Sequence, residues 1–536
     1  MEALDWLVIG VFFLALIGII VWVVRQKQND SADYFLGGRD ATWLAIGASI
    51  FASNIGSEHL IGLAGAGASS GMAMAHWEIQ GWMILILGWV FVPFYTRSMV
   101  YTMPEFLERR YNPQSRTILS VISLVSYVLT KVAVTVYAGG LVFQQVFGIK
   151  ELWGIDFFWI AAIGLVVLTA LYTIFGGMKS VLYTSVLQTP ILLLGSLIIL
   201  VLGFKELGGW DEMMRVCGAV TVNDYGDTMT NLIRSNDDAN FPWLGALIGS
   251  AIIGFWYWCT DQFIVQRVLS GKNEMEARRG TIFGAYLKLL PVFLFLIPGM
   301  IAFALHQKYI GAGGEGFLPM LANGTANADA AFPTLVAKLL PAGVKGLVVC
   351  GILAALMSSL ASLFNSSAML FTIDFYKRFK PETPEKKLVG IGQIATIVIV
   401  VLGILWIPIM RSVGDVLYTY LQDVQSVLAP GIAAAFLLGI CWKRTSAQGG
   451  MWGLISGMVI GLTRLGAKVY YSNAGEVADS TFKYLFYDMN WLFFCGWMFL
   501  FCIIVVIVVS LATEAPTAEK IQGLVFGTAT KEQKAS

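Results

Sequence analysis

The stretch Ala52-Ser53-Asn54-Ile55-Gly56-Ser57-Glu58-His59 interrupts an apolar segment at about 43–66. That segment is long enough to cross a bilayer, which takes about 20 mainly apolar residues. Small polar residues around a glycine predict a discontinuous helix, whose freed backbone carbonyls can coordinate a hard cation. The alternative is a seam of small residues where two helices pack closely. Asn54, Glu58 and His59 favour a binding site, because polar groups inside a membrane are costly and usually functional.

The composition indicates a membrane protein around this interrupted helix. Of 536 residues, 57% are hydrophobic and 13% are charged, whereas a soluble domain has about 25% charged residues. This excludes a soluble enzyme, and the net charge of +1 gives no reason to expect nucleic acid as a partner. Six cysteines without paired spacing and three histidines predict neither a disulfide framework nor a large metal centre. No catalytic nucleophile–base spacing and no phosphate loop occur, so we expect neither an enzyme nor an ATP-driven pump.

Thirteen apolar segments are candidate membrane spans. They run at about 5–25, 43–66, 76–100, 115–147, 155–176, 181–203, 242–264, 280–305, 335–373, 386–410, 414–441, 449–471 and 490–512. The segments 115–147 and 335–373 exceed one straight span and are expected to tilt or to continue past the bilayer. Lys and Arg gather in every second loop, which predicts an external N-terminus and a cytoplasmic C-terminus.

Further polar residues lie within these spans. Glu78 is near the external start of the third span, Lys288 is eight residues into the eighth, and Gln422 is inside the eleventh. Each has a plainer alternative role: an interfacial carboxylate, a snorkelling lysine, or an amide that joins two helices. Lys131, in the middle of the fourth span, is assigned only as a structural charge partner.

Two more segments have chemistry suited to a small solute and an ion. The run from Trp256 to Gln262 closes the seventh span, and it is either an interfacial aromatic belt or a platform for the C–H face of a sugar. Asp261 and Arg267 flank this run and could pair. Ser358 and Ser359 could supply oxygens to a cation or could bond back to their own helix. The whole pattern predicts a secondary transporter of a small polyhydroxylated solute, coupled to a cation.

Several motifs resemble those of the sodium/solute symporter family, and within it the sodium/glucose cotransporters. They are Ala32-Asp33-Tyr34-Phe35-Leu36-Gly37-Gly38-Arg39, Phe51 to Ser57, Tyr172 to Gly177, Trp256 to Arg267, Met357-Ser358-Ser359-Leu360, and Lys443-Arg444 followed by Gly449-Gly450 and Gly453. The resemblance runs from about Ala32 to Ala512. It implies the leucine-transporter-type fold, an all-α membrane fold with two inverted five-helix repeats.

The resemblance also implies a division of the chain. We expect a first peripheral helix and cytoplasmic link at 1–42, the first repeat at 43–203, an external loop at 204–241, the second repeat at 242–441, two peripheral helices at 442–512, and a cytoplasmic tail at 513–536. Substrate and ion would lie near the bilayer midplane, at the broken first helix of each repeat.

The same resemblance implies the site residues. The solute site would comprise Asn54, His59, Glu78, Tyr257, Trp258, Lys288 and Gln422, with Tyr257 also the inner gate. Leu63, Trp77 and Tyr418 would form the outer gate. Na+ would bind the backbone carbonyls of Ala52, Ile55 and Ala355 and the hydroxyls of Ser358 and Ser359. No residue is expected to be catalytic.

Four positions depart from what is common in the family. Gly254 replaces a polar residue, Glu58 and Gln80 differ from the residues of animal relatives, and Ser185 replaces an Asp implicated in a second cation site or in coupling. The first three leave the identity of the hexose open. The fourth predicts one sodium ion per sugar.

The expected function is sodium-coupled symport of a glucose- or galactose-like monosaccharide by alternating access. The expected location is the plasma membrane, with a bacterial inner membrane as the specific prediction. The alternatives are symport of another small polar solute, such as an inositol or sialic acid, or a transporter-like sensor.

Overall fold

The computed structural model describes residues 1–26, 30–56, 58–321, 324–413, 417–473 and 478–528. Within these ranges it describes the backbone but not the side chains of residues 79, 129–130, 409–413, 417–423 and 473. The described chain is almost entirely helical. Its two strands, β1 (Glu151–Leu152) and β2 (Ile155–Asp156), form a short antiparallel pair. Nine helices of the described ranges are long and apolar enough to cross a membrane, as the composition predicted for a polytopic protein.

The predicted discontinuity lies between α3 (Trp43–Asn54) and η2, a π-helical turn at Glu58–Leu63. At Ile55 the backbone has φ −79° and ψ 98°, outside the helical region. The chain then continues as α4 (Ala64–Ser70). The last carbonyls of α3 therefore have no following helical turn to accept from.

The elements before and after this broken helix complete the first half of the chain. They are α1 (Ala3–Arg25), α2 (Ser31–Leu36), η1 (Gly37–Arg39), η3 (Gly71–Met74), α5 (Ala75–Ile79), α6 (Trp82–Ile86), η4 (Leu87–Phe91), α7 (Val92–Ser98), α8 (Met103–Arg110), α9 (Pro113–Ser126), η5 (Tyr127–Val132), α10 (Ala133–Phe147), α11 (Phe157–Leu207) and α12 (Trp210–Gly218). The single run α11 covers both spans expected at 155–176 and 181–203. It bends at Gly177, where φ is +52° and a Cβ atom would lie 2.4 Å from the Tyr34 carbonyl oxygen. Glycine thus allows the chain to turn there without a connecting loop.

A second broken helix opens the other half. It consists of α13 (Trp243–Gly254), the π-helical turn η6 (Phe255–Thr260) and α14 (Gln262–Leu269), and it departs from helical geometry at Asp261. The later elements are α15 (Glu274–Leu287), η7 (Val292–Leu296), α16 (Ile297–Gly311), η8 (Ala328–Ala330), α17 (Ala331–Leu339), α18 (Val344–Met369), η9 (Leu370–Tyr376), α19 (Lys377–Phe379), α20 (Glu385–Val413), α21 (Leu417–Cys441), α22 (Ala447–Asn473), α23 (Thr481–Lys483), η10 (Tyr484–Asp488), α24 (Trp491–Ala512) and α25 (Ala518–Ile521).

The segment expected as one long span at 335–373 is divided in the structure. The helix α17 ends at Leu339 and α18 begins at Val344. Pro341 lies in the interval, and Gly343 has φ +81°. A proline and a left-handed glycine in four residues end one helix and start the next.

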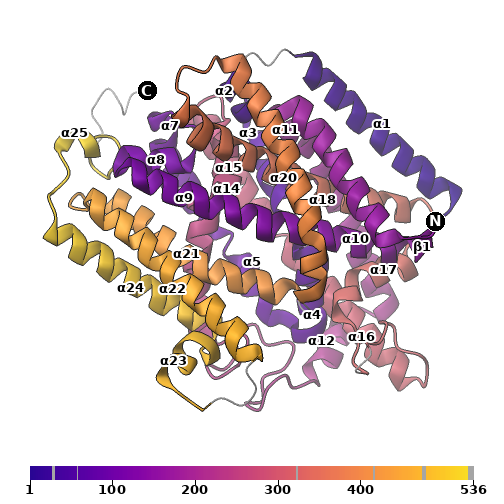
Figure 1. Cartoon of the computed structure of the whole chain (residues 1–536). Coiled ribbons are helices and arrows are strands. Elements are labelled where there is room, and N and C mark those ends of the chain that lie inside the picture. Colours follow the sequence, from indigo (N-terminus) through magenta and orange to yellow (C-terminus); the bar gives the residue numbers. More distant parts are fainter. Residues whose placement is uncertain (27–29, 57, 322–323, 414–416, 474–477, 529–536) are drawn as a thin grey trace.

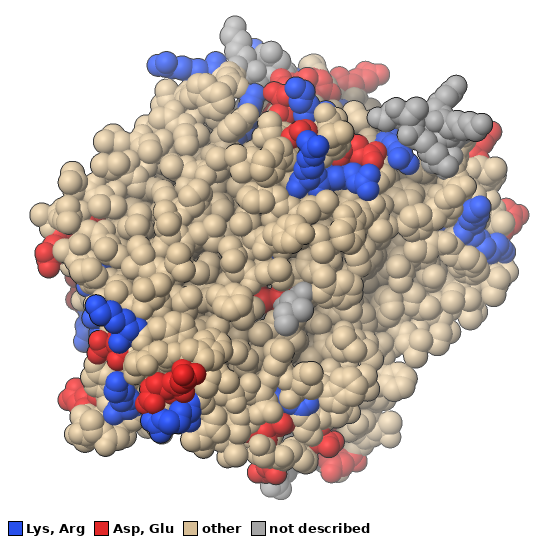
Figure 2. Space-filling view, turned by 180° about the vertical axis from the view of Figure 1, so that it is seen from behind, with Lys and Arg blue, Asp and Glu red and all other residues tan. Residues whose placement is uncertain are grey.

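The breaks of the two broken helices lie in the interior, and Ile55 and Asp261 are both buried. Helix α11 packs along α18, and α15 packs along α3, whereas α21, α22 and α24 pack mainly on one another at one side (Figure 1). Where α4 crosses α16 the backbones touch, since a Cβ atom on Gly299 would lie 1.9 Å from the Ala64 carbonyl oxygen. Figure 2 shows charged side chains around the upper rim and the lower edge, with a mostly uncharged surface between them. That distribution suits a surface surrounded by lipid.

Candidate functional site

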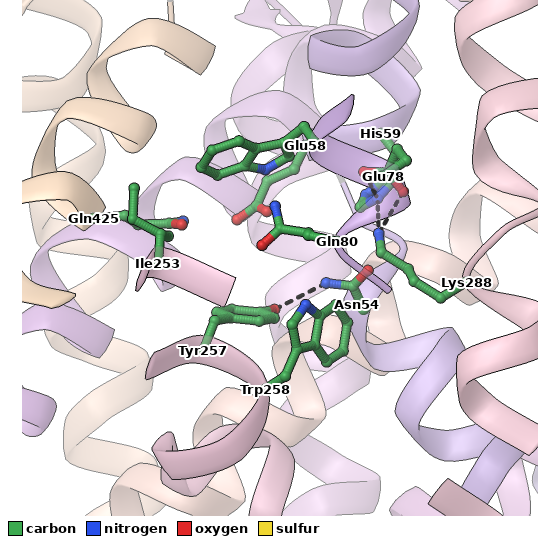
Figure 3. A pocket seen from close by; sticks show the side chains of 11 residues that line it. Asn54, Glu58, His59, Glu78, Gln80, Ile253, Tyr257, Trp258, Lys288 and Gln425 are labelled. Carbon is green, nitrogen blue, oxygen red and sulfur yellow. Dashed lines mark hydrogen bonds and ion pairs between the residues drawn. The ribbon is translucent and has the colours of Figure 1, made fainter. Parts of the chain in front are cut away.

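A small cavity of about 30 Å³ lies beside the break after α3. Both broken helices contribute to it, together with α5 and the end of α15 (Figure 3). Its lining residues are Asn54, Glu58, His59, Trp77, Glu78, Gln80, Ile253, Tyr257, Trp258, Lys288 and Gln425. Polar groups from distant parts of the chain therefore converge on one space, which in this state has room for about one water molecule, so a solute enters only when its walls move apart.

One wall of the cavity is a buried cluster of three ionisable groups. Lys288 Nζ donates to Glu78 Oε2 at 2.6 Å and lies 2.8 Å from His59 Nε2. His59 Nε2 is in turn 3.3 Å from Glu78 Oε1. All three side chains are at most 4% exposed. A buried charge needs such partners, because taking it out of water is expensive.

A second wall, which adjoins this cluster, is aromatic and comes from η6. Tyr257 and Trp258 lie edge to face with ring centroids 4.9 Å apart, and the Tyr257 hydroxyl accepts a hydrogen bond of 3.0 Å from Asn54 Nδ2. This bond joins the last residue of α3 to the middle of η6. The two broken helices are thus connected directly at the cavity.

Two polar atoms in the lining have no partner among the described residues. They are Asn54 Oδ1 and His59 Nδ1, and both are buried. A buried polar atom without a hydrogen bond costs about 1–3 kcal/mol. These atoms are available to a ligand that brings hydroxyl groups.

The structure therefore brings together six residues of the predicted solute site: Asn54, His59, Glu78, Tyr257, Trp258 and Lys288. The side chain of the seventh, Gln422, lies outside the described residues, and so does that of Tyr418 from the predicted outer gate. Trp77 lines the cavity and packs against Trp491 with ring centroids 5.5 Å apart. Leu63 is buried but is not part of the lining.

Four lining residues were not in the predicted set of solute-binding residues: Glu58, Gln80, Ile253 and Gln425. Of these, Glu58 had favoured a binding site at the break, and Glu58 and Gln80 had been noted as departures from animal relatives. The sequence contained a signal for Gln425, because it lies three residues after Gln422 in α21 and so shares a helix face with it. Gln80 depends on the glycine at 254, since a Cβ atom there would lie 2.5 Å from Gln80 Oε1. The two departures from the family pattern, at Gly254 and at Gln80, are therefore structurally linked, because the Gln80 side chain occupies the space that a side chain at 254 would need.

A second group of oxygens lies where α18 passes the break of α3. The Ser359 hydroxyl donates to the Ser53 carbonyl at 2.7 Å and lies 3.5 Å from the Ile55 carbonyl oxygen. Ala52 is in the last turn of α3, and Ala355 is one turn before Ser359 on α18. The residues predicted to bind Na+ thus come from two neighbouring elements, and hydroxyl and carbonyl oxygens are suitable ligands for a hard cation.

Ser358 faces a different group of hydroxyls. Its Oγ lies 3.2 Å from Ser185 Oγ, which is 3.5 Å from Ser49 Oγ. Arg267 Nε donates to the hydroxyls of Ser49 and Ser53 at 3.1 and 2.9 Å. The guanidinium of a fully buried arginine therefore lies among the serines beside the predicted ion site.

The possible pairing of Asp261 with Arg267 is not what the structure has. Asp261 Oδ2 instead accepts from Lys131 Nζ at 2.7 Å, while Arg267 is turned to the serines. Asp261 caps the first turn of α14, whereas Arg267 lies in its last turn. Their side chains therefore project from opposite ends of the helix. The assignment of Lys131 as a structural charge partner thus has a specific partner.

Comparisons with known proteins agree with this architecture. The family model "Sodium:solute symporter family" matches residues 34–457. The mouse (Mus musculus) sodium/myo-inositol cotransporter 2 is 37% identical over 98% of this chain and 80% of its own length. The zebrafish (Danio rerio) sodium/glucose cotransporter 4 is 36% identical over 97% of this chain and 80% of its own length. A solved Na+-coupled sialic acid symporter, in a substrate-bound outward-open state, superposes with a TM-score of 0.77 at 21% identity, covering 96% of this chain and 99% of that one. The predicted leucine-transporter-type fold is thereby confirmed, while the count of thirteen spans and the orientation of the termini stay predictions.

Proposed function

Because the chain belongs to the sodium:solute symporter family and is therefore a sodium-coupled membrane transporter rather than an enzyme, we propose that it carries a monosaccharide together with Na+ by alternating access. The observation that supports this most is the lining of the cavity. Its lining combines an aromatic wall with hydrogen-bonding groups spread over several helices. A pyranose has the matching surfaces, an apolar C–H face and a ring of hydroxyls.

The charges of the cavity favour a neutral solute. Glu58 and Glu78 both line it, and Lys288, the one lysine or arginine in the described lining, is bonded to Glu78. A carboxylate on the solute would meet two acidic side chains and one lysine that is already paired. This favours a sugar or a polyol over an acid such as sialic acid.

A cyclic polyol is the second candidate. This candidate is supported by two relatives that match 98% of this chain. They are the sodium/myo-inositol cotransporters 2 of mouse and human, at 37% and 36% identity. An inositol has hydroxyls on every ring carbon and would use the same hydrogen-bonding groups. The two candidates therefore differ in ring chemistry, not in the kind of site they need.

Coupling between ion and solute follows from adjacent residues at the break of α3. The Ser53 carbonyl accepts from Ser359 on α18, and the next residue, Asn54, donates to Tyr257 below the cavity. An ion that holds the break against α18 would fix Asn54 and so preform the solute site. Bound solute would in turn favour the same arrangement, since coupling between two sites is reciprocal.

The test is uptake into proteoliposomes. Labelled glucose, galactose, myo-inositol and sialic acid are offered with an inward Na+ gradient and, as the control, with K+ in its place. We expect sodium-dependent uptake of a hexose, with inositol as the next best solute. Sodium-driven uptake of inositol alone would favour the second candidate, and uptake of sialic acid alone would contradict both.

Replacing Ser359 with alanine is expected to raise the Na+ concentration for half-maximal uptake. The change removes one predicted ion ligand and the hydrogen bond to the Ser53 carbonyl, at a cost of about 1–3 kcal/mol, or roughly five- to 150-fold. The half-saturating solute concentration should rise as well. Ser367→Ala, on the same helix and also buried, is the control and should leave both values near those of the wild type. An unchanged sodium dependence in Ser359→Ala would place the ion elsewhere.

The plasma membrane is the proposed location, and a bacterial inner membrane stays a prediction. A multi-pass chain with a mostly uncharged surface between two charged rims is suited to any bilayer of ordinary thickness (Figure 2).

A further inference from the structure

Lys131 is a buried cation in the membrane interior that the proposed ion and solute sites do not use. It belongs to η5, and its side chain is 5% exposed. Nζ donates to Asp261 Oδ2 at 2.7 Å. The other oxygen of Asp261 accepts from the Tyr127 hydroxyl and from the Phe263 backbone N–H. The carboxylate is thus fully bonded at the break of the second broken helix.

The ammonium group of Lys131 also lies against four aromatic rings. Nζ is 4.6 Å from the centroid of the Tyr257 ring, 4.9 Å from that of Phe263, 5.1 Å from that of Tyr127 and 5.4 Å from that of Trp256. A cation over aromatic faces is attracted by their negative potential, more strongly where water is excluded. Tyr257 is therefore held from two sides, by Asn54 at its hydroxyl and by Lys131 at its ring.

A second cavity of about 20 Å³ adjoins this pair and lies between the two proposed sites. Ser53, Gly56 and Ser359 line it from the side of the ion site, and Asn54 and Tyr257 from the side of the solute site. Its remaining lining residues are Glu58, Lys131, Thr135, Phe263 and Leu363. A space of this size can hold one water molecule or one small ion.

We propose that the Lys131–Asp261 pair is a latch that positions Tyr257 under the solute and bars Na+ from this second cavity until the solute has moved. The ammonium holds the ring of Tyr257, which lines the second cavity, and it also holds Asp261 at the break of the second broken helix. Breaking the pair would release both Tyr257 and the turn at Asp261. That this release opens the path toward the cytoplasm rests on the proposed symport function.

The test is sodium leak without solute. Proteoliposomes loaded with ²²Na+ are diluted into solute-free buffer, and efflux is compared among variants that elute as monodisperse protein. We expect Lys131→Met and Asp261→Asn each to raise efflux about tenfold, which corresponds to about 1.4 kcal/mol in the opening equilibrium. Lys131→Arg keeps the charge and should stay near the wild type. The double variant should leak no more than either single one, because the two residues act as one pair.

Arg464→Met is the matched control. Arg464 is also a buried cation over an aromatic ring, 4.0 Å from the centroid of Phe494, but it belongs to the peripheral helix α22. Its loss should disturb packing to a similar degree without a leak. Wild-type efflux from folded Lys131→Met and Asp261→Asn would overturn the latch, as would an equal leak from Arg464→Met or additive effects in the double variant.

Two further measurements keep the outcome clear. If Lys131→Met does not fold because Asp261 is left unpaired, the double variant, in which neither charge remains, decides in its place. Sodium-driven solute uptake by the wild type is measured in the same vesicles. Failure of that uptake concerns the proposed function, whereas efflux without solute concerns the latch alone.

Discussion

Replacing Lys288 with alanine is expected to raise the half-saturating solute concentration by up to about a hundredfold. The amine bonds to Glu78 at 2.6 Å and lies 2.8 Å from His59, and all three are buried. Its removal takes a charged hydrogen-bond donor from the solute site, and a hydrogen bond to a charged group contributes up to about 3 kcal/mol, where 1.4 kcal/mol is tenfold. The measurement is the concentration dependence of sodium-driven uptake.

Two variants separate the causes of this effect. In Lys288→Ala combined with Glu78→Gln no carboxylate is left unpaired, so any remaining loss reports the hydrogen bonds that the solute itself requires. Lys308→Ala, at the end of α16 and bonded to the Leu207 carbonyl, is the control lysine outside the cavity. Wild-type solute affinity in Lys288→Ala would remove this wall from the solute site.

The broken helix could be predicted from the sequence because its signal is local. A glycine among small polar residues inside an apolar segment has few interpretations, and Ile55 leaves helical geometry within that stretch. The same is true of the polar residues, whose cost in lipid marks them wherever they occur. Family resemblance then assigned them to one site, and the cavity contains six of the seven.

The partners of those residues could not be predicted from the sequence. Lys288 meets His59 and Glu78 across 229 and 210 residues, and Lys131 meets Asp261 across 130. Which charges pair depends on how whole helices are rotated, and no local pattern contains that information. Arg267 was therefore a reasonable predicted partner for Asp261, because the two are close in the sequence. The prediction was wrong, because the folded chain brings Lys131 to Asp261 instead.

The predicted helix boundaries were wrong where one or two residues change the direction of the chain. Gly177 allows two expected spans to follow each other without a loop, and Pro341 with Gly343 divides one expected span in two. Hydropathy averages over about 20 residues. It cannot register a turn made by one or two.

One sodium ion per solute is the prediction with the largest effect on what the transporter can do. At about 100 mV one inward charge supplies about 2.3 kcal/mol, and a tenfold Na+ gradient adds about 1.4 kcal/mol. One ion could thus concentrate the solute on the order of 500-fold, and two ions by the square of that. Reversal potentials of proteoliposomes at fixed Na+ and solute gradients measure the ratio directly.

The physical reason lies around Ser185. Its hydroxyl donates to the Val181 carbonyl at 2.6 Å and lies 3.2 Å from Ser358 Oγ, where an Asp would have offered a full negative charge. The neighbouring hydroxyls of Ser49 and Ser53 already accept from the Arg267 guanidinium. A second Na+ would therefore have to shed its water among neutral oxygens beside a fixed positive charge, where repulsion in a dry interior amounts to several kcal/mol. A measured ratio of two would mean that Ser362 and its neighbours provide enough oxygen to offset that repulsion, and Ser185 would then not mark a lost ion site.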